Sequence, residues 1–189
     1  MNQRESEIQL LETENSEDYK KLKALYQQSF PLYERLPLAL WKKIETKFYS
    51  IYDHEEWIGF IMLLSNKELV YISYFAIDPK FQSKGYGGKV LEKIKSEYDG
   101  KRIFLAAEKA IEGTKNFEQR CKRNAFYERQ GFVFSGYGMN MKSASMNLLI
   151  YGGNFEPRDL IDFIQECVGG SIGKLLQWQV KKFLKESTS

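Results

Sequence analysis

A chain of 189 residues, of which 43% are hydrophobic, has the size and composition of a folded protein with its own core, which excludes a disordered chain. The formal net charge of +3 is too small to indicate a nucleic-acid partner. The polar N-terminus and the lack of a long apolar run predict a cytoplasmic protein with no membrane segment.

The first part of the chain alternates helical and extended patterns. Apolar residues from Tyr19 to Phe30 recur at helical spacing, Asn15 or Ser16 can cap that helix, and Pro31 ends the pattern. We expect a strand at 8–11, helices at 16–28 and 38–46, and strands at 47–52, 57–64 and 69–77.

The second part of the chain predicts helices at 87–98, 116–130 and 156–168, strands at 103–107, 132–139 and 146–151, and an amphipathic segment at 174–185. Hairpins followed by a strand–helix–strand crossover predict an α/β (α+β) fold. In such a fold a mixed, mostly antiparallel sheet is flanked by helices. We expect one domain over residues 1–155 and a helical C-terminal extension over 156–189, packed on that domain or on a partner subunit.

A glycine-rich turn at residues 82–88, with the sequence Gln-Ser-Lys-Gly-Tyr-Gly-Gly, lies between the strand at 69–77 and the helix at 87–98. A helix that begins on glycines presents backbone N–H groups and a positive dipole end, which together favour a phosphate. The P-loop pattern is absent because Val90 follows Gly88-Lys89, and Val90 also breaks the dinucleotide-binding fingerprint. The turn is therefore a phosphate site of another kind.

Two motifs in this sequence resemble signature motifs of the GNAT superfamily of N-acyltransferases. Gln82-x-x-Gly85-x-Gly87, preceded by the segment 74–79 (Tyr-Phe-Ala-Ile-Asp-Pro), is similar to the acyl-CoA signature of that superfamily. Residues 126–132 (Phe-Tyr-Glu-Arg-Gln-Gly-Phe) resemble its late helix-to-strand junction. The resemblance covers residues 69–134 and implies a layered fold and transfer of an acetyl or similar group from acetyl-CoA to an amine.

The same resemblance assigns residues to the donor. The turn would hold the pyrophosphate of the donor, and the preceding strand would hold its pantetheine arm. The helix at 116–130 would turn one of its faces toward the donor. Arg120 stands where many members have asparagine. The implied cofactor-binding residues are Phe75, Ala76, Ile77, Gln82, Ser83, Lys84, Gly85, Tyr86, Gly87, Gly88, Asn116, Arg120, Arg123 and Phe126.

Tyr127 matches the tyrosine that many members of the superfamily use as general acid, since a phenol can protonate a leaving thiolate. The general base is less defined, because Tyr71 occupies the place of a glutamate found in some members. Glu108, at the end of a strand, and Glu34, on a loop expected to border the acceptor, are the candidates. A chain of water molecules that removes the proton of the amine, without a single basic residue, is equally consistent with the sequence.

Two cysteines and one histidine, without paired ligand spacing, predict neither a disulfide framework nor a metal site. The sequence leaves the acceptor open among small-molecule and peptide amines, and it allows a homodimer. Two other functions stay open: a non-catalytic acyl-CoA-binding regulatory protein, and a docking module that uses the segment 174–185.

Overall fold

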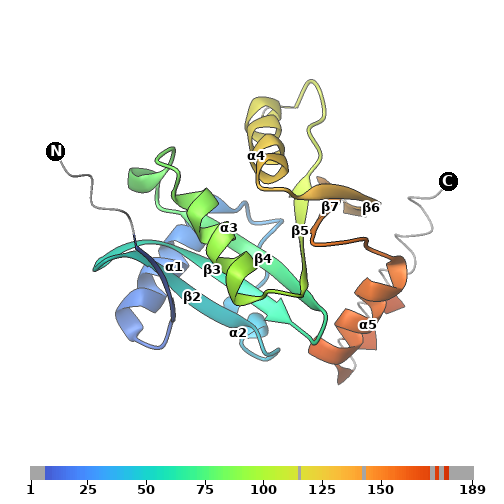
Figure 1. The fold of residues 1–189 in the computed structure, drawn as a ribbon, viewed down its shortest axis with the longest axis horizontal. Helices are drawn as coiled ribbons and strands as arrows, with labels where there is room; N and C mark the ends of the chain where they lie inside the picture. Colours follow the sequence, from blue (N-terminus) through green and yellow to red (C-terminus); the bar gives the residue numbers. More distant parts are fainter. Residues whose placement is uncertain (1–6, 115, 142–143, 171–172, 175–176, 179–189) are drawn as a thin grey trace. The chain divides into compact units, whose positions relative to one another are not determined.

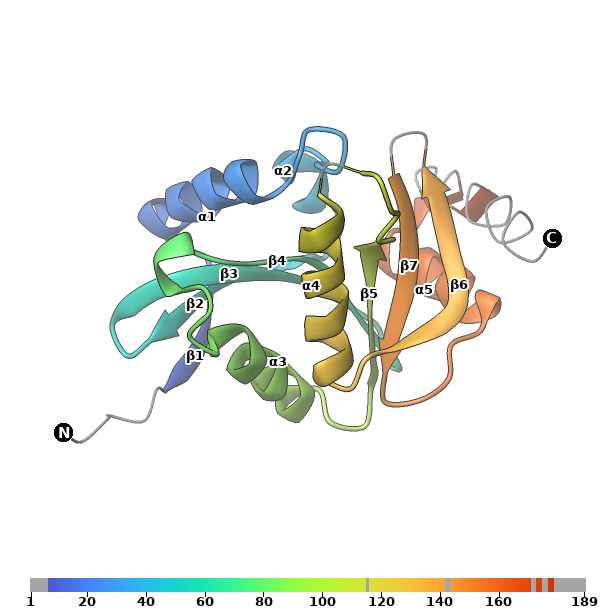
Figure 2. The ribbon, with the colours of Figure 1, turned by 90° about the horizontal axis from the view of Figure 1, so that it is seen from above.

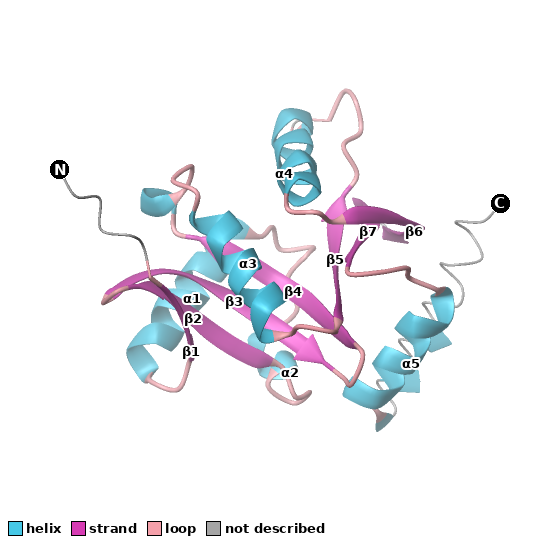
Figure 3. Ribbon diagram, in the orientation of Figure 1, coloured by secondary structure: helices cyan, strands magenta, loops and turns pink. Residues whose placement is uncertain are grey.

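The computed structural model describes residues 7–114, 116–141, 144–170, 173–174 and 177–178, and it confirms the mixed α/β fold (Figures 1 and 3). Seven strands form a sheet in the order β1-β2-β3-β4-β5-β7-β6. The pairs β1–β2, β2–β3, β5–β7 and β6–β7 are antiparallel. The strands are β1 (Ile8–Glu12), β2 (Lys47–Asp53), β3 (Glu56–Ser65), β4 (Leu69–Ile77), β5 (Arg102–Glu108), β6 (Val133–Met141) and β7 (Ala144–Tyr151).

The α-helices lie close to the predicted segments. They are α1 (Ser16–Ser29), α2 (Leu38–Trp41), α3 (Tyr86–Glu97), α4 (Phe117–Arg129) and α5 (Pro157–Cys167), with a short 3₁₀ helix η1 (Pro79–Phe81) after β4. The chain divides into two compact units, the first formed by Met1–Leu64 and Ile72–Asp99, the second by Ser65–Tyr71 and Gly100–Ser189. The boundary falls inside β4, so this strand contributes to both units.

In the first unit, α1 and α3 cover opposite faces of the strands (Figure 2). β3 is buried along almost its whole length, because its continuous apolar sequence suits a strand that is covered on both faces. Leu22 and Leu25 of α1 are buried, and Val90, Leu91 and Ile94 form the buried stripe of α3. This packing fixes the helix that follows the glycine-rich turn.

Local capping signals were predicted well, whereas the second helix is shorter than expected. The Asn15 side chain accepts a hydrogen bond from the Asp18 N–H at 2.7 Å, so Asn15 is the residue that caps α1. The helix expected at 38–46 ends at Trp41. The backbone then tightens through i→i+3 hydrogen bonds, from Lys43 N to Leu40 O and from Ile44 N to Trp41 O, before β2 begins.

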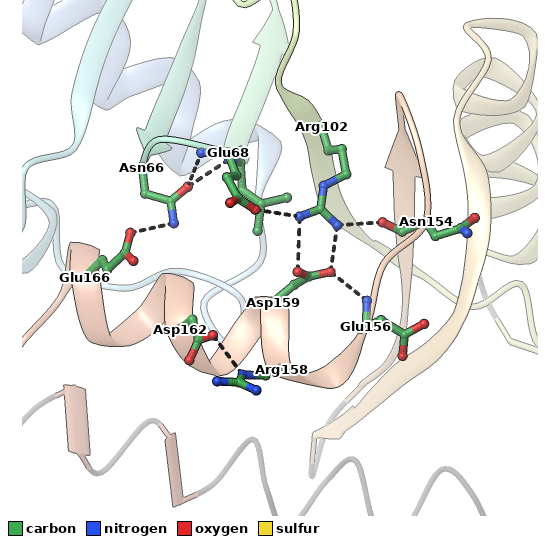
Figure 4. Close-up of polar contacts among 10 residues, drawn as sticks. Asn66, Glu68, Arg102, Asn154, Glu156, Arg158, Asp159, Asp162 and Glu166 are labelled. Atoms are coloured by element: carbon green, nitrogen blue, oxygen red, sulfur yellow. Dashed lines mark hydrogen bonds and ion pairs between the residues drawn. The ribbon is translucent and has the colours of Figure 1, made fainter.

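In the second unit, α5 is tied to β5 by a network of charged groups around Arg102 (Figure 4). The guanidinium binds both carboxylate oxygens of Asp159, with Nη1–Oδ2 and Nη2–Oδ1 distances of 2.8 and 3.1 Å. It also donates to Glu68 Oε2 and to the backbone oxygen of Asn154. Asp159 accepts from the Glu156 N–H as part of a capping box, so one carboxylate both starts α5 and anchors it.

Most of the amphipathic segment predicted at 174–185 lies outside the described residues. Within the part that is described, the Gln177 side chain donates to the Ile161 oxygen of α5 at 3.1 Å. The division into a domain at 1–155 and an extension at 156–189 stays a prediction. No helix in the described ranges is long and apolar enough to cross a membrane.

Substituting Asp159→Asn is expected to lower the free energy of unfolding by about 2 kcal/mol at pH 7, because charge-assisted hydrogen bonds to Arg102 are lost. Burial raises the pKa of Asp159, but hydrogen bonds from Arg102 and from the Glu156 N–H outweigh burial and leave that pKa below its ordinary value. The stabilisation is therefore present above about pH 4 and disappears as pH falls through the lowered pKa. Urea denaturation at several pH values measures the difference.

The matched control is Asp162→Asn on the same helix, whose ion pair with Arg158 is exposed. Little change is expected for it at any pH. Equal losses for the two variants would contradict the anchoring role of Asp159.

Candidate functional site

The glycine-rich turn begins where β4 ends. Asp78 caps the short η1 helix, because its Oδ1 accepts from the Lys80 N–H at 2.9 Å, and Pro79 occupies the first helical position. The Asp78 N–H in turn donates to the Ile58 oxygen of β3 at 2.8 Å. The end of β4 is thus fixed to its neighbouring strand immediately before the turn.

Gln82 closes the turn with its side chain. Its Nε2 donates to the Ile77 oxygen at 2.8 Å, so the amide bridges the strand end and the turn. Ser83 and Gly85 both have positive φ, at 61° and 85°. This left-handed backbone reverses the chain direction within a few residues and leads it into α3. Residues 82–85 are exposed.

The first turn of α3 is the strongest candidate for an anion site. A helix beginning at Tyr86 leaves the N–H groups of Gly85, Tyr86, Gly87 and Gly88 without helical partners, and the Gly85 cap has no side chain to satisfy them. The helix dipole adds a positive potential at the same place. The adjacent Lys84 ammonium lies 5.3 Å from the Phe81 ring centroid and adds a charge. These features suit a diphosphate.

The Tyr86 side chain also stabilises the turn. Its hydroxyl donates to Asp53 Oδ2 at 2.7 Å, and the Asp53 Oδ1 accepts from the Glu7 N–H. The hydrogen bond to Asp53, followed by burial, raises the pKa of Tyr86. Asp53 was not predicted, because it lies in a β-hairpin 33 residues away from Tyr86 and carries no motif.

The β4 residues predicted to line the donor lie on alternate faces. Ala76 is buried, whereas Phe75 and Ile77 are partly exposed. Gly59 of β3 approaches so closely that a Cβ at this position would lie 2.3 Å from the Ala76 oxygen. The Ala76 carbonyl is therefore directed at β3, and the Ile77 carbonyl is occupied by Gln82.

Glu34 lies on a loop whose backbone is held by two buried tyrosines. The Tyr74 hydroxyl donates to the Glu34 oxygen at 2.7 Å and accepts from the Leu36 N–H at 3.3 Å. The Tyr26 hydroxyl donates to the Leu36 oxygen at 2.9 Å. Burial strongly raises the pKa of Tyr26, so it acts here as a neutral donor. The loop that carries Glu34 is thereby fixed at its backbone.

In the second unit, the charged face of α4 pairs with the end of β5. Arg120 Nη2 lies 2.9 Å from Glu108 Oε1, and Arg123 Nη2 lies 3.4 Å from Glu108 Oε2. Both arginines predicted to contact the donor thus hold a buried carboxylate. Asn116 occupies the position before the first helical residue of α4 and forms no side-chain cap.

Tyr127 lies one turn after Arg123 on the same helix. Its ring is flanked by Phe126 and Phe132, at centroid distances of 5.2 and 5.9 Å. Burial raises the pKa of Tyr127, while the Arg123 charge acts in the opposite direction. The phenol is therefore protonated at neutral pH and available as a proton donor.

The structure brings the predicted residues together in two groups. The strand end, the turn and Glu34 belong to the first unit, and Glu108, Arg120, Arg123, Phe126 and Tyr127 to the second. The described residues contain no group of three or more His, Cys, Asp or Glu side chains suited to a metal ion.

Comparison with known proteins identifies a family. Residues 45–134 match the acetyltransferase (GNAT) domain family. A protein of solved structure from Bacteroides thetaiotaomicron, assigned to the GNAT acetyltransferases, is 25% identical. The match covers 85% of this chain and 94% of that chain, with a TM-score of 0.66. A search of curated proteins finds no match.

Two further solved structures share the fold. An aminoglycoside 6′-N-acetyltransferase complexed with coenzyme A is 14% identical over 77% of this chain and 96% of its own, with a TM-score of 0.59. A spermidine N-acetyltransferase from Vibrio cholerae, in complex with CoA and spermine, is 15% identical over 76% and 94% of the two chains, with a TM-score of 0.55.

The left-handed conformation at Gly85 gives a stability test. No atom lies within 4 Å of a Cβ added there, so Gly85→Ala is expected to cost only the backbone strain, about 1 kcal/mol. Gly85→Asn is the matched variant and should cost less, since asparagine tolerates this region better. Urea denaturation of both variants measures the difference, and equal losses would contradict the conformational explanation.

Proposed function

Because the chain belongs to the GNAT superfamily, we propose that it is an N-acetyltransferase that moves an acetyl group from acetyl-CoA to a primary amine. The observation that carries the proposal is the turn at 82–88, exposed at residues 82–85, where backbone N–H groups without helical partners begin α3. Two proteins of the same fold are described in complex with CoA, which supports the choice of donor.

The turn would hold the diphosphate of CoA through the N–H groups of residues 85–88, with Lys84 adding a positive charge. Gln82 and Tyr86 would act indirectly, because their side chains already fix the turn to Ile77 and Asp53. We assign the partly exposed Phe75 and Ile77 to the pantetheine arm. Positioning the thioester in this way supplies a large part of the rate.

The chemistry needs a neutral amine, stabilisation of the carbonyl oxygen and a proton for the thiolate. The amine nitrogen attacks the thioester carbon, the C–S bond breaks, and the Tyr127 hydroxyl protonates the departing sulfur. The nitrogen then loses a proton, which restores the phenol directly or through solvent, so that amide and free CoA thiol are the products. Tyr127 is a neutral phenol at pH 7 and therefore holds a proton that it can give to the thiolate, although burial raises its pKa and makes it a weaker acid than a free tyrosine.

For the base that takes a proton from the ammonium form of the acceptor before attack, we retain Glu34, whose loop is fixed by Tyr26 and Tyr74. Glu108 is the weaker candidate, since a proton taken up by its carboxylate would weaken two ion pairs. A primary amine as acceptor is supported by the spermine complex of one structurally similar protein, the spermidine N-acetyltransferase. The donor turn and Tyr127 belong to different units, so their roles are tested separately.

Titration of coenzyme A and acetyl-CoA in a calorimeter tests the donor site. Saturable binding is expected, and Gly85→Ala should weaken it, because the added side chain disturbs the backbone that carries the N–H groups. Absence of binding to the wild-type protein would refute the assignment of the turn.

Turnover is tested by following released thiol with acetyl-CoA and a panel of amines, including polyamines, amino sugars and peptides. Tyr127→Phe is expected to lower kcat by about 100-fold while the Kd for coenzyme A stays the same, because only the proton donor is removed. Tyr19→Phe, which removes a hydroxyl from α1, serves as the control. An unchanged kcat for Tyr127→Phe would rule out the acid role, and CoA binding without any turnover would favour a non-catalytic acyl-CoA-binding protein.

A further inference from the structure

Glu108 is an unusually buried carboxylate, at 2% relative exposure, and it lies at the last residue of β5. Each of its oxygens faces a different guanidinium, Arg120 at 2.9 Å and Arg123 at 3.4 Å. A buried charge is tolerated only where partners compensate for the loss of hydration, and the two guanidinium groups provide that compensation for Glu108.

The backbone around Glu108 is held by the same stretch of α4. The Asn124 amide donates to the Glu108 oxygen at 3.3 Å, and Arg120 Nη1 donates to the Lys109 oxygen at 3.4 Å. Three side chains of α4, at positions 120, 123 and 124, thus converge on two residues at the end of β5. We refer to Glu108, Arg120, Arg123 and Asn124 as the Glu108 clamp.

None of the apolar side chains of α4 is fully buried, and Phe117, Phe126 and Tyr127 are partly exposed. Arg120 is its only buried residue among those described for this helix. The next contact on the C-terminal side is Phe132, which is buried; its N–H donates to the Tyr127 oxygen at 3.1 Å and its ring packs edge-on against Tyr127. Tyr127 therefore lies between the clamp and the Phe132 anchor.

We propose that Glu108 is a positioning residue that fixes α4 and thereby directs the Tyr127 hydroxyl. The proposal rests on the proposed function of Tyr127 as proton donor. It gives Arg120, which replaces the asparagine of the family pattern, a definite task in holding the helix. If Glu108 is a positioning residue, it is not the general base, because its carboxylate acts through Tyr127 and touches no reacting atom.

The kinetic test compares Glu108→Gln with Asp159→Asn, which breaks the other well-connected ion pair of the same unit without touching α4. Glu108→Gln is expected to lower kcat by about 10- to 100-fold, while the KM for acetyl-CoA and the Kd for coenzyme A change less than about twofold. Asp159→Asn should lower the melting temperature but keep kcat. Equal kcat values for Glu108→Gln and wild type would overturn the proposal.

A double variant separates positioning from direct catalysis. Once Tyr127 is replaced by Phe, the substitution Glu108→Gln should lower kcat no further, because its effect passes through the phenol. If the two losses multiply, Glu108 acts independently, as a base would, and the proposal is wrong. If Glu108→Gln does not fold, Arg123→Gln is the milder variant, because it leaves the Arg120–Glu108 pair intact. It should also lower kcat, by a smaller factor, and it should lower kcat no further once Tyr127 is replaced by Phe.

Spectra of protein with ¹³C-labelled tyrosine give a readout that does not depend on activity. The tyrosine signal that is absent from the spectrum of Tyr127→Phe belongs to Tyr127. This signal is expected to shift in the spectrum of Glu108→Gln and to keep its position in that of Asp159→Asn. An unmoved signal would refute positioning, whatever the activity. A shifted signal in a protein that binds coenzyme A but transfers no acetyl group would support positioning and refute the proposed function.

Discussion

Exposed N–H groups at the start of α3 are the constraint on which the proposed chemistry depends. They bind an anion only if the turn before them keeps its shape without using those groups. Gln82 and Tyr86 meet this requirement, because their side chains bond to the Ile77 oxygen and to Asp53 and leave the helix terminus uncovered. Gly85 provides the left-handed backbone between them. The turn is thus preorganised by side chains and open at its backbone.

Charged groups help to hold α4 and α5 of the second unit, and α5 also buries the apolar side chains of Leu160, Phe163 and Ile164. Arg102 and Asp159 fix α5, and Glu108 with Arg120 fixes α4. An ion pair with two defined oxygens and two defined nitrogens permits few orientations of the helix that carries it. This use of charge suits the role proposed for Tyr127 on α4, because a proton donor has to point in one direction.

Local signals gave reliable predictions. β4 was predicted at its observed bounds, Asn15 was one of the two residues expected to cap α1, and the turn before α3 was identified from glycine spacing. The second helix was predicted too long, because propensity alone does not reveal where i→i+3 hydrogen bonds take over. Arg120 and Arg123 were predicted to contact the donor, but their partner Glu108 was not foreseen.

The sequence by itself determined the elements, the glycine-rich turn and the family, since these depend on neighbours a few residues apart. Only the tertiary structure decided that Tyr86 bonds to Asp53, that Gln82 turns back to Ile77, and that Glu108 is engaged by α4. Such contacts follow from strand register and from the direction in which a helix leaves the sheet. Those geometric relations arise only when distant segments pack, so no local pattern encodes them.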